Sequence, residues 1–284
     1  MISVIVPFRN SRRHFACLLE SLAAQHVEVP WEVVVVDNGS RDGSRLIAEQ
    51  FAHRLPLRIV DAFDRSGAAH ARNVGVRHSA GSRLLFIDAD DSVAPGYVAA
   101  LADALERHPF ATSRVDSTSL NPAWVREAHG PPWQAEQVLV FYGFLPAAGT
   151  NIGIDRKLFE RIGGFPAEFR ACEDIAFSWR AQLQEQVQPQ FISSTAYRYR
   201  YRDTLLGLFT QNVVWGLSSA LLYRRFRDAG MPGRTARMAL QEWRDVVVSL
   251  LRASSRSQLA PAVVRLGTCV GRILGSARYG VLFF

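Results

Sequence analysis

The 284-residue sequence has few cysteines and a single lysine, Lys157. The cysteines Cys17, Cys172 and Cys269 form no C-x-x-C pair, so we expect neither a disulfide framework nor a cysteine zinc site. Such a chain suits a reducing compartment, and we predict a cytoplasmic protein. The sequence has no uncharged apolar run of about 18 residues, so we do not expect a full transmembrane span. The N-terminal ISVIVPF also lacks the features of a signal peptide and is typical of a strand.

Two kinds of motif are also missing. No G-x-G-x-x-G follows the first predicted strand, which argues against a dinucleotide-dependent oxidoreductase. No recognised nucleic-acid motif accompanies the basic residues, so we predict no nucleic-acid partner.

The formal charge of +7 is unevenly distributed. Residues 196–284 contain 14 arginines, no lysine and four acidic residues, a net charge of +10, which leaves −3 for the first 195 residues. This asymmetry indicates an anionic partner for the C-terminal third, which by charge alone is a membrane surface, a nucleic acid or a phosphorylated substrate. Apolar residues at helical spacing accompany the arginines, so packing on the catalytic domain or a homo-oligomer is the alternative to peripheral attachment at the inner face of a membrane.

The first half alternates short β-rich runs with amphipathic segments. The pattern predicts strands at 2–8, 31–37, 57–62 and 83–89, and helices at 11–25, 43–53, 67–80 and 95–108. This order implies an α/β fold with a parallel sheet covered on both faces. Between Pro109 and Pro146 we expect irregular structure with a strand or two.

Order returns after this region. Asp155 is a predicted N-cap of a short helix that ends at Gly163 and Gly164. A helix over 173–186 and a strand over 189–202 follow, and then three helices over about 203–228, 235–254 and 258–277. We therefore predict a catalytic domain over 1–202, with a nucleotide part at about 1–108 and an acceptor part at about 109–202, and a helical extension over 203–284.

Polar groups follow three of the predicted strands, in PFRN, DNGS and DADD. Ligands of open parallel sheets bind beyond the carboxyl ends of the strands, so these groups predict one cleft. In DADD, alternation lets Asp88 and Asp90 face the cleft, and the small Ala89 leaves room beside them. A capping cluster for the helix at Pro95 would explain Asp91 but not all three carboxylates. Clustered hard oxygen ligands favour Mg²⁺ or Mn²⁺ on a phosphorylated substrate.

Six ordered motifs resemble those of the family 2 glycosyltransferases with a GT-A fold: SVIVPFRN, EVVVVDNGSRDGS, GAAHARNVGV, LLFIDADDSVAPGYV, RIGGF and CEDIAFSWR. The resemblance covers about residues 1–225. It implies a Rossmann-like, mostly parallel sheet with helices on both faces, and inverting transfer of one sugar from a nucleoside-diphosphate sugar to an acceptor hydroxyl.

The resemblance also assigns residues to the donor. Asp37 matches the acid that binds N3 of a uracil or thymine, which favours UDP or dTDP donors, and Asp90 matches the ligand of Mn²⁺ or Mg²⁺ on the diphosphate. Asp88 matches the carboxylate beside the ribose and the metal. The remaining donor-side residues are Pro7, Phe8, Asn10, Arg72 and Ala89.

On the acceptor side, Asp174 matches the general base, and the first turn of a helix is a location that favours its ionised form. Gly164, Phe165 and Glu173 lie in the matching acceptor motifs. The acceptor itself, whether a glycan, a lipid-linked saccharide or another hydroxyl compound, is left open.

Two departures from the family limit the assignment. The Q-x-x-R-W motif of processive relatives is missing, which indicates transfer of one sugar rather than chain synthesis. The segment TAYRYRYRD has no histidine where family members often place a third metal ligand. A catalytically inactive sugar-nucleotide-binding or scaffold protein is therefore one alternative. A haloacid-dehalogenase-like phosphohydrolase is another, because LLFIDADD also resembles its D-x-D strand. In that family, however, D-x-D ends the first strand and a later lysine is expected, whereas here Lys157 is the only one.

Overall fold

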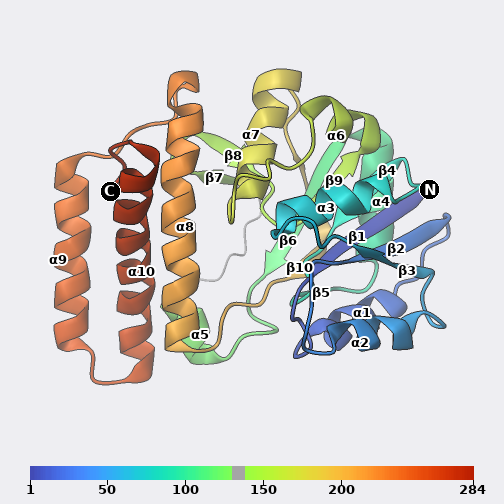
Figure 1. Ribbon diagram of the computed structural model, residues 1–284, viewed down its shortest axis with the longest axis horizontal. Helices are drawn as coiled ribbons and strands as arrows, with labels where there is room; N and C mark the ends of the chain where they lie inside the picture. The colour runs from blue at the N-terminus through green and yellow to red at the C-terminus, as the bar shows by residue number, and fades with distance from the viewer. Residues whose placement is uncertain (130–137) are drawn as a thin grey trace.

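The computed structural model describes residues 1–129 and 138–284, in which a curved sheet stands beside a layer of three long helices (Figure 1). A separate hairpin pairs β7 (Leu139–Phe141) with β8 (Leu145–Ala147). The strands of the main sheet are β1 (Ile2–Phe8), β2 (Trp31–Asp37), β3 (Leu57–Asp61), β4 (Arg83–Phe86), β5 (Ser92–Val93), β6 (Phe110–Asp116), β9 (Ile152–Asp155) and β10 (Gln190–Arg198).

The strand order in the sheet is β3-β2-β1-β4-β9-β6-β10-β5. Neighbours β1, β2, β3 and β4 are parallel, as are β6 and β10. The sheet is mostly parallel, as predicted, but β9 runs antiparallel to both β4 and β6, and β5 runs antiparallel to β10. The four-residue β9 directly precedes a helix and is too short to show a period in the sequence.

Helices cover both faces of the sheet, as predicted. Val4 and Val6 of β1 face a core formed with α1 (Phe15–Ala23), α2 (Ser44–Phe51) and α4 (Tyr97–Arg107). Ile5 faces the opposite core, formed with α3 (Ala68–Arg77), α6 (Arg156–Ile162) and α7 (Glu173–Glu185). Burial on both faces explains the continuous apolar runs in β1 and β2.

The segment from 109 to 146 is more regular than predicted where it is described. It contains β6, the helix α5 (Ala123–Ala128), β7 and β8, and residues 130–137 of the prediction lie outside the described residues. β6 escaped the pattern because its buried side chains include Thr112 and Ser113. Asn151 satisfies this polar stretch: its side chain donates to the Ser113 carbonyl at 2.7 Å, and its carbonyl accepts from Thr112 Oγ1 at 2.7 Å.

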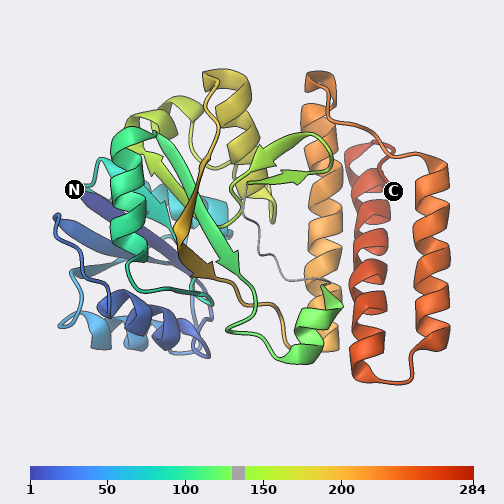
Figure 2. The same cartoon turned by 180° about the vertical axis from the view of Figure 1, so that it is seen from behind.

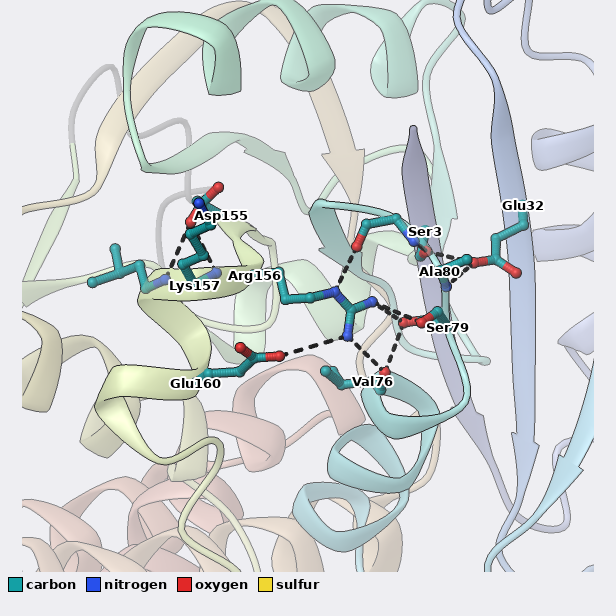
Figure 3. A network of polar contacts seen from close by, with 11 residues as sticks. Ser3, Glu32, Val76, Ser79, Ala80, Asp155, Arg156, Lys157 and Glu160 are labelled. Carbon is teal, nitrogen blue, oxygen red and sulfur yellow. Dashed lines mark hydrogen bonds and ion pairs between the residues drawn. The ribbon is translucent and has the colours of Figure 1, made fainter.

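Arg156, the first residue of α6, joins this helix to the end of α3, as Figure 3 shows. Its guanidinium donates to the carbonyls of Val76 at 3.0 Å and Ser79 at 2.9 Å at the end of α3. Asp155 caps α6 as predicted, accepting from the amides of Lys157 and Leu158 (Figure 3). These contacts fix α3 and α6, whose other ends approach the carboxyl ends of the strands.

Three long helices follow the sheet: α8 (Leu205–Phe226), α9 (Ala236–Arg252) and α10 (Arg256–Tyr279), close to their predicted ranges. They stand side by side in the order α8, α10, α9 (Figures 1 and 2). A Cβ added to Gly271 would lie 2.2 Å from the Val213 carbonyl oxygen, and one on Gly216 would lie 2.3 Å from that of Thr268. The backbones of α8 and α10 therefore touch where no larger side chain fits.

By length and hydropathy alone, the described segment Leu205–Ala229 could cross a membrane, although 44% of its most apolar window is buried. A helix covered by protein on two sides has the same composition. α8 is such a helix, because α10 covers one side of it and the sheet domain another.

Candidate active site

A cavity of about 1000 Å³ opens at the carboxyl ends of β1 and β4, between the start of α7 and one side of α8. Eight of the twelve residues singled out in the sequence line it: Pro7, Asn10, Arg72, Asp88, Ala89, Asp90, Glu173 and Asp174. A cavity is thus present where PFRN and DADD end their strands, whereas no residue of DNGS, the third predicted strand end, lines it.

The other four residues lie outside the lining of this cavity. Phe8 is buried and stacks on Phe15 with ring centroids 4.7 Å apart. Phe165 is also buried, against Phe86 at 4.9 Å, and Gly164 lies beneath it, where an added Cβ would be 2.7 Å from Asn73 Oδ1. These three residues therefore pack behind the side chains that line the cavity.

Asp37 ends β2 next to the cavity and is buried. One of its carboxylate oxygens accepts from the Ser40 amide at 2.8 Å, and the other lies 3.6 Å from Arg45 Nη1. Asn10 joins this loop to the cavity: its amide donates to Ser40 Oγ at 3.1 Å, and its side chain accepts from the Arg41 amide at 2.8 Å. The ion pair between Arg45 and Asp37 was not predicted, because no local sequence pattern links the two residues.

Arg72 of α3 connects a carboxylate at the end of β4 with one at the start of α7. Its buried guanidinium donates to Glu173 Oε1 at 2.5 Å and to Asp88, and lies over the Phe165 ring at 5.3 Å. Burial works to lower the pKa of Arg72, but Asp88 and Glu173 raise it further, so the group stays charged. A buried cation with two carboxylate partners fixes the end of β4 against the start of α7.

The three clustered carboxylates have different surroundings. Asp88 and Asp90 face the cavity, but they do so from a turn, because β4 ends at Phe86, so strand alternation was the wrong reason for their common direction. Asp91 points away and accepts from the Tyr197 hydroxyl and the Arg200 amide, both at 2.6 Å. The capping alternative was also wrong, since Gly96 is the N-cap of α4.

Asp90 carries a charge partner that the sequence did not reveal. Arg202 Nη1 lies 3.2 Å from Asp90 Oδ2, and Arg200 Nε donates to the Asp90 carbonyl at 2.8 Å. Burial raises the pKa of Asp90, Arg202 opposes this, and the nearby Asp88 adds to the rise. Such a carboxylate is stabilised by any further cation that enters the cavity.

Asp174 lies in the first turn of α7, where its Oδ1 accepts from the Ile175 amide at 2.8 Å. Burial and the adjacent Glu173 raise the pKa of Asp174 to about 7, against the opposing effect of Arg72. The first turn of a helix favours the ionised form, but desolvation and a like charge outweigh the dipole here. A pKa near neutrality is what a general base requires.

Several basic side chains that were not singled out in the sequence also line the cavity: Arg9, Arg13, His14, Arg170, Arg200 and Arg202. Burial, Arg200 and Arg13 lower the pKa of His14 to about 4, so this histidine is neutral among cations. The arginines of YRYRYR were the available clue, but β10 ends at Arg198, and Tyr199, Arg200, Tyr201 and Arg202 beyond it all line the cavity.

A metal could be held by Asp88 and Asp90 alone. Among residues 1–129 and 138–284, no group of three or more His, Cys, Asp or Glu side chains is arranged to bind a metal ion. Mg²⁺ commonly uses one or two carboxylates together with water and substrate phosphates, and this pair of carboxylates fits that pattern.

The profile of the family described as Glycosyl transferase family 2 matches residues 3–163 of this chain. An uncharacterized glycosyltransferase of Haemophilus influenzae is 30% identical over 185 residues, which cover 62% of this chain and 60% of that protein. Poly(ribitol-phosphate) beta-N-acetylglucosaminyltransferase TarS of Staphylococcus aureus is 29% identical over 203 residues, which cover 69% of this chain and 35% of TarS. The matches thus span less than two thirds of either relative.

Two solved structures share the fold. S. aureus TarS 1-349 in complex with UDP-GlcNAc aligns with a TM-score of 0.58 and 20% identity, covering 99% of this chain and 92% of that one. The mannosyltransferase PcManGT from Pyrobaculum calidifontis, in complex with GDP-Man and Mn²⁺, aligns with a TM-score of 0.65 and 19% identity, covering 98% and 86%. The predicted fold is confirmed by these neighbours.

Proposed function

Because the chain belongs to glycosyl transferase family 2, as its motifs predicted, we propose that it transfers one sugar from a nucleoside-diphosphate sugar to an acceptor hydroxyl with inversion. The observation that carries this proposal is one cavity that both groups of carboxylates line. Asp88 and Asp90 line it from the turn after β4, and Asp174, with a pKa of about 7, lines it from α7.

The nucleotide is proposed to lie along Pro7, Asn10 and the DNGS loop. Asp37 would accept a hydrogen bond from a uracil or thymine, which favours UDP or dTDP, and one of its oxygens would have to be released by Arg45. The neighbour TarS was solved with UDP-GlcNAc and the neighbour PcManGT with GDP-Man. Both are nucleoside-diphosphate sugars, and this is the donor class that we propose here.

Mn²⁺ or Mg²⁺ is the proposed cofactor, held by Asp90 with Asp88 beside it. Such an ion, when bound, neutralises charge that develops on the leaving diphosphate. Arg200 and Arg202 contribute positive charge on the same side of the cavity, where relatives often have a histidine ligand. We propose that Arg202 releases Asp90 when the donor enters and then contacts the diphosphate, since arginine binds phosphate oxygens in a fixed fork.

Asp174 is the proposed general base. Glu173, the neighbouring carboxylate, accepts from Arg72 at 2.5 Å and is thereby committed to holding that cation. Asp174 makes no ion pair among the described residues, and it faces the cavity. It can therefore accept the proton of an attacking hydroxyl group at neutral pH.

The division into parts is also a proposal, with one change in content. Residues 1–108 supply the nucleotide side, 109–202 supply the base, and 203–284 form the extension. The acceptor side is not confined to 109–202, because Thr210, Gln211 and Trp215 of α8 line the same cavity. Cys17, Cys172 and Cys269 are free thiols, which supports the proposed cytoplasmic location.

The test is a panel of nucleotide sugars, measured for binding and for slow hydrolysis without acceptor, with and without Mn²⁺. Metal-dependent binding of a UDP-sugar or dTDP-sugar is the expected result. Binding without any hydrolysis or transfer would favour the inactive scaffold protein. Release of phosphate from simple phosphomonoesters would favour the phosphohydrolase, although Lys157 does not line the cavity.

A further inference from the structure

The three-helix layer exposes an unusual share of apolar surface. Of the 17 large hydrophobic side chains exposed in the described chain, 11 lie between Leu206 and Leu282, in less than a third of the sequence. A contiguous exposed apolar patch on a soluble domain marks an interaction site more often than chance. The question is whether these side chains share one side of the layer.

On α9, one row of apolar side chains lies away from α10. Val246 is the buried residue, and Glu242 reaches Arg272 of α10 at 2.7 Å, so these two positions mark the side that faces α10. At 100° per residue, Leu240 and Val247 lie about a quarter turn away, with Trp243 between them and Val246. Leu240 is 73% exposed and Val247 is 51% exposed.

On α10, a similar row lies between two occupied sides. Gly267, Gly271 and Gly275 touch the backbone of α8, and Arg272 faces α9. The four-residue spacing of Leu266, Val270 and Leu274 places them on a third side. Leu274 is 49% exposed, and the other two are half-buried.

On α8, Leu206, Val213 and Leu217 form the corresponding row, next to the contact of Val213 and Leu217 with Gly271. α8 and α10 run in the same direction and α9 runs in the opposite one (Figure 1). Seen from one end of the layer, successive residues advance around α8 and α10 in one rotational sense and around α9 in the opposite sense. The row on each helix lies about a quarter turn from the side that contacts the neighbouring helix. These rotations place all three rows on the same side of the layer. We call the surface formed by these three rows the helical platform.

Positive charge adjoins the helical platform on two of its helices. Arg224, seven residues after Leu217, continues the row on α8, and Arg278, four residues after Leu274, continues the row on α10. Both are exposed and form no ion pair with any described residue. The acidic residues of α9 are already engaged, Glu242 by Arg234 and Arg272 and Asp245 by Arg244. An apolar surface with a cationic rim complements an anionic lipid surface.

A second copy of the chain is the rival occupant. In a two-fold contact, each surface meets the same surface, so the unpaired arginines of one copy would face a copy that also carries a net charge of +10 over 196–284. That arrangement is repulsive, whereas anionic headgroups neutralise the same arginines. The charge pattern therefore selects lipid.

We propose that the helical platform rests on an anionic lipid bilayer and holds the protein at its surface. The helical platform adjoins the cavity, because Thr210 and Val214, which lie on α8 beside the platform row, line the cavity. The acceptor is then one that the bilayer carries, with its hydroxyl reaching the cavity from the lipid side. This last step rests on the proposed transferase function, and the binding itself does not.

The experiment is co-sedimentation of the full chain with vesicles of phosphatidylcholine, pure or containing about one third phosphatidylglycerol. The chain should sediment with the anionic vesicles at low salt and be released by added salt. The double variant Leu240→Asp/Val247→Asp should reduce the bound fraction at least about ten-fold, and Arg224→Glu and Arg278→Glu about five-fold or more each. Leu46→Asp, at a 62% exposed site on α2, and Arg77→Glu, on α3, are the matched controls and should bind as the unaltered chain does.

Two outcomes would overturn the platform. One is a chain that stays in the supernatant at low salt with the anionic vesicles. The other is a dimer in sedimentation velocity that Leu240→Asp/Val247→Asp dissociates, which would assign the surface to a second copy. Mn²⁺-dependent UDP binding, measured in solution by calorimetry on the same variants, should be unchanged. If the unaltered chain shows no Mn²⁺-dependent UDP binding, the proposed function is rejected and the membrane result is unaffected.

Discussion

Replacing Asp174 by asparagine tests the proposed base, because it keeps the shape of the side chain and removes its basicity. Turnover should fall by about 10² or more, while donor affinity stays within a few fold. Donor affinity is preserved because Arg72 holds its two carboxylate partners, Asp88 and Glu173, without Asp174.

The pH dependence follows from the raised pKa. With a pKa of about 7, roughly one tenth of Asp174 is ionised at pH 6 and roughly nine tenths at pH 8. The turnover number of the unaltered enzyme should therefore rise roughly ten-fold between these values. In Asp174→Asn this rise should disappear along with most of the activity.

The same pKa makes a prediction about stability. The folded state holds the Asp174 proton up to about pH 7, and the unfolded chain releases it near 3.8, so the free energy of unfolding falls as pH increases between these values. The difference corresponds to about 4 kcal/mol as an upper limit. Asp174→Asn should therefore be more stable than the unaltered protein at pH 8, and this gain should shrink towards pH 5.

The assay is transfer or donor hydrolysis from pH 5.5 to 8.5 with saturating donor, together with thermal unfolding at the same pH values. Asp203→Asn is the control, because Asp203 lines the same cavity but pairs with Arg13 at 2.6 Å near the surface. It should keep the rise with pH. Near-normal turnover by Asp174→Asn would refute the assignment and make Glu173 the next candidate.

Three further changes test other parts of the site and fold. Asp90→Ala should weaken UDP binding in Mn²⁺ and abolish most of its metal dependence in calorimetry; equal affinity of the unaltered protein with and without metal would contradict this role. Arg202→Ala should lower affinity for UDP more than for uridine, since only the former carries a diphosphate, and an equal loss for both would reject the proposed contact. Gly271→Ala should cost about 2 kcal/mol in denaturant unfolding, because its Cβ would meet the Val213 carbonyl at 2.2 Å, whereas the exposed Ala277→Ser on the same helix should change little.

Local pattern was enough for much of the fold. The buried strands β1 and β2 and the helix capped by Asp155 are recognisable because their apolar periods and caps depend on near neighbours. β6 and β9 were not recognisable as central strands. β6 buries polar residues that only Asn151, distant in sequence, can satisfy, and β9 is four residues long.

The site divides in a similar way. Sequence motifs brought Asp88, Asp90, Arg72 and Asp174 together as candidates, and the structure places all four in one cavity, while their catalytic roles stay predictions. The partners that set their charges were invisible, because Arg202 meets Asp90 across more than a hundred residues. The pKa of Asp174 likewise depends on burial, which no local pattern reports.

By itself, the sequence determined the family, the alternation of strands and helices, and the excess of arginine in the last third, since each of these is written in local order and composition. Only the tertiary structure decided which carboxylate turned inward to Tyr197, which arginines entered the cavity, and which apolar residues were left uncovered. The glycines of α10 contact α8, and Arg272 of α10 pairs with Glu242 of α9. Packing between these helices therefore fixed which side of α10 stays exposed.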